Sequence, residues 1–359
     1  MKKIIPTRNF IIFKDKHYNT FPSIIRKNDG EFMLCFRQAP DWQHLYGKVT
    51  HVDPGSMAVY LTSRDGENWN DSPEVLYDDY LFGVQDPCLN TLKDGSLFCT
   101  FFMWKVYLRS ELEDKNGHQV YDKWVGKFDK LYSIISKDGG RTWSRPVPIA
   151  DKYGGALRGV CTELDDGAIL APVYANINGS GMLMIFRTYD QGQNWEKIAM
   201  VESEDYHLGE TSLLKTKSGK IVAFIRTVIK NKEPGKEDFY SPLLTSESLD
   251  NGITWSTPTK REFYSSSPFH PLQLDNGQVF ISFGYRIKPF GIRAFLLDEE
   301  CVDFDKAEET VLRDDGLGFD IGYTSAVQLP GGKVLVVYYY YDTVNGPRYI
   351  AGTICEIRG

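Results

Sequence analysis

Short runs of apolar residues, interrupted by tight polar turns, recur along the whole chain. An apolar run of strand length, a turn that ends in glycine and a second apolar run occur together six times. Turns such as Asp-Gly, Asn-Gly, Ser-Gly and Gly-Gly between apolar runs are typical of β-hairpins, because the turn needs a positive φ that glycine adopts at little cost. The six turn glycines are Gly30, Gly95, Gly167, Gly219, Gly277 and Gly332.

The spacing of these turns predicts how the hairpins are arranged. Successive turn glycines lie 65, 72, 52, 58 and 55 residues apart, which is enough chain for one four-stranded sheet in each repeat. Helical periodicity is weak throughout. Six such sheets arranged radially form a β-propeller, which leaves only short, protected strand edges. We therefore predict an all-β six-bladed β-propeller, with residues 1–359 forming one domain.

A second repeat lies out of phase with the hairpins. It reads Ser/Thr-x-Asp-x-Gly-x-x-Trp, with full copies at residues 136–143, 188–195 and 248–255 and a copy one residue shorter at residues 63–69. In this Asp-box the Ser/Thr and Asp side chains hydrogen-bond the turn backbone, and the tryptophan packs beneath the turn. We interpret the boxes as folding elements and not as catalytic ones.

Composition and charge narrow the class of function. The net charge is -7, so no basic surface is expected for nucleic acid or an anionic membrane. No apolar run approaches the roughly 18 residues of a membrane span, and the N-terminal apolar run is too short for a secretory signal. We expect a cytoplasmic protein, with a trimmed secreted or periplasmic form as the alternative. The six scattered cysteines show no zinc-binding spacing, and we predict neither a metal nor a cofactor.

The turn glycines also provide reference positions from which equivalent residues of the six hairpins can be counted. The start of the first strand and the end of the second lie on the same side of a hairpin, so equal offsets should ring one mouth of the channel. Nine positions before the glycines stand Phe21, Asp86, Arg158, Glu210, Pro268 and Tyr323, and His270 follows Pro268 by two positions. Seven positions after them stand Arg37, Phe102, Tyr174, Arg226, Gly284 and Tyr339. Charges at the ends of buried strands are costly unless they are paired or face water. The pattern thus predicts a polar active-site floor or, as the alternative, a set of ion pairs that closes the channel.

The combination of hairpins and Asp-boxes resembles the sialidase (neuraminidase) superfamily over nearly the whole chain. In that family a Glu opens the fourth-blade hairpin, an Arg follows on the return strand, and a Tyr opens the last hairpin. Glu210, Arg226 and Tyr323 match these positions. The resemblance implies that the Tyr323 hydroxyl is the nucleophile and Glu210 its base, since a phenol with a pKa near 10 needs a base to attack at neutral pH.

The resemblance leaves other roles open. The family's fifth-blade arginine is matched by Arg293 or, as the alternative, by Arg286. The family's general acid is an Asp on a first-blade loop, where Asp53 and Asp41 both qualify, and where His51 can serve as the acid or hold the Asp. The remaining residues that we expect to bind substrate are Arg37, Asp86, Arg158, Arg226, Tyr174 and His270.

One position departs from the family pattern. Sialidases carry an arginine before the Ile-Pro of the first hairpin, and this chain has Thr20 there. Threonine cannot replace the bidentate fork that arginine offers a carboxylate. Either Arg37 or Arg158 supplies the missing charge, or the substrate is not a sialic acid.

From the sequence we expect an exo-acting glycoside hydrolase that cleaves a terminal acidic sugar from a glycan or oligosaccharide. One alternative is another carbohydrate-active propeller such as a polysaccharide lyase, in which His51, His207 or His270 would take a proton α to a uronate. Another is a glycan-binding propeller without chemistry. The oligomeric state does not follow from the sequence.

Overall fold

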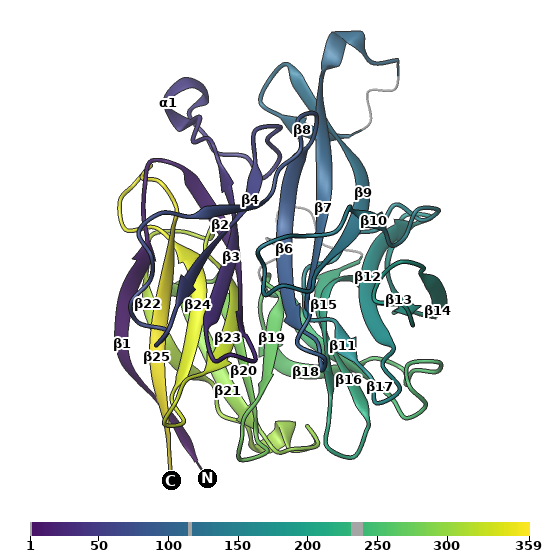
Figure 1. The fold of residues 1–359 in the computed structure, drawn as a ribbon, viewed down its shortest axis with the longest axis vertical. Coiled ribbons are helices and arrows are strands. Elements are labelled where there is room, and N and C mark those ends of the chain that lie inside the picture. The colour runs from purple at the N-terminus through teal and green to yellow at the C-terminus, as the bar shows by residue number, and fades with distance from the viewer. Residues whose placement is uncertain (1, 114–116, 231–239) are drawn as a thin grey trace.

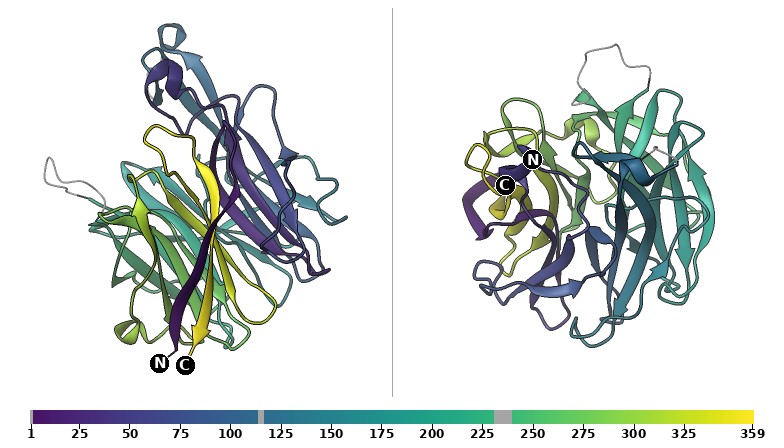
Figure 2. Two further views of the ribbon diagram at one scale, coloured as in Figure 1. Left: turned by 90° about the vertical axis from the view of Figure 1, so that its left-hand side faces the viewer. Right: turned by 90° about the horizontal axis from the view of Figure 1, so that it is seen from above.

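The computed structural model describes residues 2–113, 117–230 and 240–359. Within these ranges six antiparallel sheets surround a central axis, as the view from above in Figure 2 shows. The predicted six-bladed β-propeller is therefore confirmed. Along those same ranges, no helix has the length and apolar character needed to cross a membrane.

The six blades follow one another along the chain, and each is named by its strands from the axis outward. Blade 1 contains β2 (Tyr18–Arg26), β3 (Phe32–Ala39), β4 (Met57–Ser63) and β5 (Glu74–Tyr77). Blade 2 contains β6 (Gly83–Thr91), β7 (Leu97–Leu108), β9 (Trp124–Ser136) and β10 (Val147–Pro148), with β8 (His118–Val120) paired to β9. Blade 3 contains β11 (Thr162–Glu163), β12 (Ile169–Ile177), β13 (Ser180–Thr188) and β14 (Glu196–Val201).

The second half of the chain continues the same order. Blade 4 contains β15 (Tyr206–Lys215), β16 (Ile221–Ile229), β17 (Pro242–Ser248) and β18 (Thr259–Tyr264). Blade 5 contains β19 (Phe269–Gln273), β20 (Val279–Tyr285), β21 (Phe290–Leu297) and β22 (Thr310–Gly316). Blade 6 contains β23 (Gly322–Gln328), β24 (Val334–Tyr340), β25 (Tyr349–Arg358) and β1 (Lys3–Phe13). Short helices lie at α1 (Gln43–Tyr46), η1 (Arg109–Glu111) and η3 (Phe304–Lys306).

Blade 6 takes strands from both ends of the chain. β1 pairs with β25 from Lys3 opposite Arg358 to Phe13 opposite Ile350, and the two termini lie side by side in Figure 1. This pairing closes the ring. The core lies between neighbouring blades, where for example Phe36 of blade 1 packs in one cluster with Val337 of blade 6.

The turns have the chemistry that their sequences predict. All six turn glycines have φ values between 83° and 93°, in the left-handed region. Each Asp-box joins the third and fourth strands of a blade. At residues 136–143, Asp138 Oδ1 accepts hydrogen bonds from Ser136 Oγ at 2.8 Å and from the Thr142 amide at 2.9 Å. The box side chains thus hold their own turns.

Four first strands have a register shift near their beginnings, in β2, β6, β15 and β23. At three of these bulges a residue other than glycine adopts a left-handed φ: Phe21 at 56°, Asp86 at 50° and Tyr323 at 51°. Such a conformation costs on the order of 1–3 kcal/mol per residue and is concentrated at functional sites. The same end of the ring carries α1 and the β7–β9 extension with β8, which project beyond the blades in Figure 1.

The close approach of blades 5 and 6 yields a stability prediction. A Cβ on Gly284 would lie 2.7 Å from the Cα of Gly322 and 3.0 Å from Ser267 Oγ. Gly284→Ala should therefore lower the free energy of unfolding by about 1–3 kcal/mol, measured by urea denaturation. The matched control is Gly209→Ala, whose new Cβ meets only the Arg226 carbonyl oxygen, at 3.4 Å. Equal urea midpoints for the two variants would contradict the prediction.

Candidate active site

Three side chains meet at the mouth where the first strands begin. The Tyr323 hydroxyl donates a hydrogen bond to Glu210 Oε1 at 2.7 Å. Arg226 Nη1 donates to both carboxylate oxygens of Glu210 at 2.6 Å and to the Tyr323 hydroxyl at 3.2 Å. Glu210 and Tyr323 are only 7% and 6% exposed, so this contact lies in a nearly dry environment. Strands of blades 4 and 6 thus bring together a phenol, a carboxylate and a guanidinium.

The charges of this group favour an ionised carboxylate beside a neutral phenol. Burial by itself would raise the pKa of Glu210, but Arg226 and the Tyr323 hydroxyl hold that pKa below its ordinary value. Burial, followed by the negative charge of Glu210, raises the pKa of Tyr323 well above that of a free phenol. The phenol consequently cannot ionise by itself at neutral pH, while Glu210 is ready to accept its proton.

Two further guanidinium groups lie against the Tyr323 ring. The Cζ atom of Arg286 is 5.0 Å from the ring centroid, and that of Arg158 is 5.8 Å away. Arg286 donates to the Tyr339 hydroxyl at 2.8 Å and to the Ile321 carbonyl at 3.0 Å. Arg158 donates to the carbonyls of Pro22 at 2.6 Å and Tyr323 at 3.3 Å. These contacts fix both cations beside the phenol.

Arg37 is the most unusual of the buried cations. It is fully buried, and none of its three guanidinium nitrogens has a hydrogen-bond partner among the residues that the structure describes. Thr20 lies opposite Arg37 in the β2–β3 register, and its buried hydroxyl likewise has no partner within the described chain. Burial lowers the pKa of Arg37, and the strongest opposing charge is Asp53. A buried guanidinium without hydrogen bonds is costly, so Arg37 is the least satisfied of these cations.

Asp86 is the second acidic group on the floor. Its Oδ1 accepts a hydrogen bond from Gln85 Nε2 at 3.1 Å, and the residue is 4% exposed. Burial raises the pKa of Asp86 to about 7; Arg158 opposes this change, whereas the negative charge of Glu210 adds to it. The floor therefore carries two carboxyl groups with pKa values shifted in opposite directions.

The three loop candidates for the general acid differ in their surroundings. Asp53 accepts hydrogen bonds on both oxygens, from Trp42 Nε1 and from the Gly55 amide, each at 2.8 Å. Asp41 accepts from the Gln43 amide at the start of α1. His51 is linked to the phenol through one aromatic neighbour. Its ring is 5.1 Å from the Phe21 ring, which in turn is 4.8 Å from the Tyr323 ring.

The structure separates the two fifth-blade arginines. Arg293, which the sequence favoured, lies within β21, where its Nε is 3.3 Å from Glu309 Oε1 and its Nη1 donates to the Arg313 carbonyl. Arg286 follows the end of β20 and therefore reaches the mouth. Tyr174 is partly buried, and burial followed by the charge of Glu210 raises its pKa well above the ordinary value.

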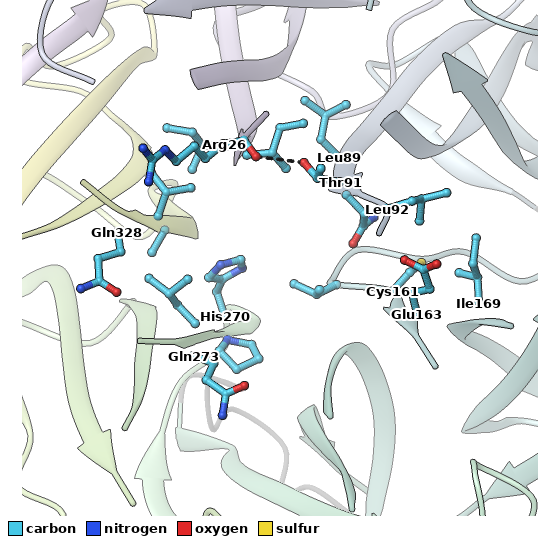
Figure 3. A pocket seen from close by; sticks show the side chains of 18 of the residues that line it. Arg26, Leu89, Thr91, Leu92, Cys161, Glu163, Ile169, His270, Gln273 and Gln328 are labelled. Atoms are coloured by element: carbon cyan, nitrogen blue, oxygen red, sulfur yellow. Dashed lines mark hydrogen bonds between the residues drawn. The ribbon is translucent and has the colours of Figure 1, made fainter. Parts of the chain in front are cut away.

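His270 lies at the opposite end of the channel. It stands near the centre of a cavity of about 410 Å³ formed where the first strands end, as Figure 3 shows. Arg158, whose guanidinium lies 5.8 Å from the Tyr323 ring, lines a small void together with His270. Burial lowers the pKa of His270 to about 3, so the imidazole is neutral. His270 lies two residues nearer its turn glycine than Pro268, the residue at the counted position, and its side chain therefore lies further along the channel.

Asp320 was not selected as a site residue from the sequence. It accepts hydrogen bonds from the hydroxyls of Tyr18 at 2.9 Å and Tyr339 at 3.0 Å, and it pairs with Arg348 at 2.9 Å. His51 Nε2 lies 3.3 Å from the same carboxylate. The only signal in the sequence was a charge three residues before Tyr323. Over the described ranges, no group of three His, Cys, Asp or Glu side chains could hold a metal ion.

Comparisons with known proteins agree with this architecture. Residues 118–336 match the family model described as a BNR repeat-like domain. A solved structure of a Dyadobacter fermentans protein of unknown function is 34% identical, with 99% of each chain covered and a TM-score of 0.88. A Streptococcus pneumoniae sialidase is 14% identical, with a TM-score of 0.65 over 96% of this chain and 70% of its own. A Penicillium chrysogenum α-L-arabinanase is also 14% identical, with a TM-score of 0.64 over 98% of each chain. A search of curated proteins gives no match.

The isolation of Arg37 predicts an unusual response to mutation. Arg37→Met should leave the thermal unfolding temperature unchanged or raise it, because methionine removes a buried charge that forms no hydrogen bond to the described residues. Arg158→Met should lower that temperature by about 2 °C or more, because it leaves the carbonyls of Pro22 and Tyr323 without their donor. Calorimetry of both variants tests the contrast. Similar losses in both would mean that Arg37 is a structural residue.

Proposed function

The chain belongs to the BNR repeat-like domain family, and from this premise we propose that it is a retaining exo-glycosidase for a terminal sugar with a negative charge. The observation that carries the proposal is the hydrogen bond from the Tyr323 hydroxyl to Glu210 at 2.7 Å, in a site bordered by arginines. The names of the sialidases and the arabinanase that share this fold indicate that those proteins act on glycans. At 14% identity they support the scaffold only, so the chemistry rests on the side chains.

In the first step Tyr323 attacks the anomeric carbon of the terminal sugar while its proton passes to Glu210. The bond from the anomeric carbon to the leaving oxygen breaks, and that oxygen takes a proton from the general acid. Water then hydrolyses the glycosyl-tyrosine with the acid residue acting as base, and Tyr323 regains its proton. A neutral phenol suits an anionic sugar because it avoids the repulsion that a carboxylate nucleophile would meet.

The arginines are suited to hold the negative group of the sugar. The buried Nε of Arg226 has no hydrogen-bond partner among the described residues. The three guanidinium nitrogens of Arg37 have none among them either. Arg286 adds a cation on the Tyr323 ring face. Arg37 lies directly opposite Thr20 and thus provides charge close to where a sialidase would carry its first arginine. A carboxylate that meets these groups gains charge-assisted, bidentate hydrogen bonds.

We assign the proton donor to Asp86. Two carboxyl groups in one site whose pKa values are displaced in opposite directions are typical of an acid and base pair. Glu210 is held ionised, and Asp86, with its pKa raised to about 7 chiefly by burial, stays protonated in mildly acidic solution. Asp53 is a weaker candidate because N–H donors already occupy both of its oxygens.

The lyase alternative has less support. The Nδ1 atom of His207 accepts a hydrogen bond from the Gly181 amide, and His270 lies at the opposite mouth. Of the three histidines considered, His51 alone approaches Tyr323. Its ring pairs with Asp320, which would hold it as a positioning group more readily than as a base that must reach a sugar carbon.

A substrate panel tests the nucleophile. The protein should release 4-methylumbelliferone from at least one glycoside of a sialic acid or a uronic acid, with retained configuration by NMR. Glu210→Gln should lower kcat by about 10²–10⁴-fold and Tyr323→Phe by at least as much. An activated fluoro-sugar of the same class should label Tyr323 in the wild type, as read by peptide mass spectrometry. Full turnover in Tyr323→Phe would overturn the assignment.

The pH dependence of kcat/KM tests the acid. Glu210 must be ionised, so the acidic limb, on which activity rises with pH, should lie below the ordinary pKa of a glutamate. Asp86 must be protonated, so activity should fall as the pH passes about 7. Asp86→Asn should remove the alkaline limb and lower activity most for substrates with poor leaving groups. If Asp53→Asn has these effects and Asp86→Asn has not, Asp53 is the acid.

A further inference from the structure

A second cavity opens beside the Tyr323 site on the same face of the ring. It has a volume of about 510 Å³, within the range of roughly 300–1,000 Å³ that is common for small-ligand pockets. Its walls come from the blade 1 loop, the β8 segment, the chain before β23 and the β24–β25 loop. Side chains in these four walls include Gln43, His51, Gln119, Phe319, Tyr341 and Asn345.

This pocket adjoins the catalytic group through shared neighbours. His51 and Asp320 line it, and the His51 ring is 5.1 Å from the Phe21 ring that covers Tyr323 at 4.8 Å. On the other side, Asp320 accepts from the Tyr339 hydroxyl, which also accepts from Arg286. His51 and Asp320 in the pocket wall, with Phe21 and Tyr339 behind them, therefore connect the pocket to the nucleophile.

The lining has the chemistry of a sugar site. Phe319 is 55% exposed, and neighbouring Leu317 and Val344 also present apolar surface at the rim. Gln43 and Asn345 add side-chain amides to the lining. Apolar faces that pack against sugar C–H groups, with amides available to hydroxyls, suit a saccharide better than a purely apolar ligand.

Asp320 does not make the pocket acidic. Its carboxylate is neutralised by Arg348 at 2.9 Å and accepts from Tyr18 and Tyr339, so its oxygens are committed to the protein. Lys48 adds a positive charge to the wall. The pocket therefore does not repel a glycan that carries a negative group.

We propose that this pocket is the leaving-group subsite, which binds the sugar residue to which the terminal sugar is bonded. The inference rests on the proposed function, because it takes Tyr323 as the position of the terminal sugar. An exo-acting enzyme with such a subsite selects its substrates by the second sugar as well as by the first.

The test compares two substrates of the same terminal sugar. One is its trisaccharide with lactose as leaving group, and the other is its glycosyl fluoride, which has no sugar to place in the pocket. The double variant Gln43→Ala/Phe319→Ala should lower kcat/KM for the trisaccharide about 10-fold or more and change that for the fluoride less than twofold. The control is Tyr189→Ala, which removes an aromatic ring that is 59% exposed on the blade 3 Asp-box. It should change neither value.

A binding measurement separates the subsite from the catalytic proposal. Saturation-transfer NMR with lactose alone should show contact with wild type and with Glu210→Gln, and should lose it in the double variant. The subsite would be overturned if wild type cleaves the fluoride and the double variant has the same kcat/KM as wild type for the trisaccharide. That result would not contradict the proposed function. A third outcome is that wild type cleaves neither substrate but contacts lactose, and that the double variant loses this contact. That outcome would support the sugar site and refute the hydrolase. Absence of lactose contact with wild type would overturn the subsite.

Discussion

Pairing between the two ends of the chain is the constraint on which the rest of the structure depends. β1 completes blade 6 by pairing with β25, and this closure fixes where blades 4 and 6 stand across the axis. Tyr323 and Glu210 are 113 residues apart, yet their side chains meet at 2.7 Å because both lie on first strands of a closed ring. The catalytic group is thus a property of the ring, and no single blade contains it.

The ring also collects more positive than negative charge at this mouth. Arg37, Arg158, Arg226 and Arg286 lie in or beside the floor, against the carboxyl groups of Glu210 and Asp86. Arg158 and Arg286 are held by carbonyls and a hydroxyl, and Arg226 by Glu210. Arg37 has no such support in the described residues. Because desolvating a cation without a partner is unfavourable, the arrangement is best explained by a ligand that brings its own negative charge. The same imbalance keeps Glu210 ionised while burial keeps Asp86 protonated.

Much of this could be predicted from sequence, because a turn glycine fixes both the register of its hairpin and the height of the strand ends. Counting from Gly219 and Gly332 sufficed to select Glu210, Arg226 and Tyr323. The count failed in blade 5. Gly284, the residue at the counted position, lies so close to Gly322 that a Cβ would come within 2.7 Å of its Cα. No side chain fits there, and the arginine that reaches the mouth comes two residues later, at Arg286. Such a close approach between blades leaves no periodic signal in one sequence.

The choice of proton donor could not be made from sequence for a different reason. Asp41, Asp53 and Asp86 are the same residue type, so the sequence does not rank them as proton donors. They differ in the N–H groups that donate hydrogen bonds to each carboxylate. Asp53 is satisfied on both oxygens, whereas Asp86 sits on a strained bulge with φ of 50° and accepts from Gln85. Phe21 and Tyr323 have the same left-handed conformation at the equivalent positions of their own first strands. The same backbone conformation therefore recurs at three first-strand bulges around the ring. Since the backbone cost is similar at all three, the chemistry at each position is set by the side chain and by its buried neighbours.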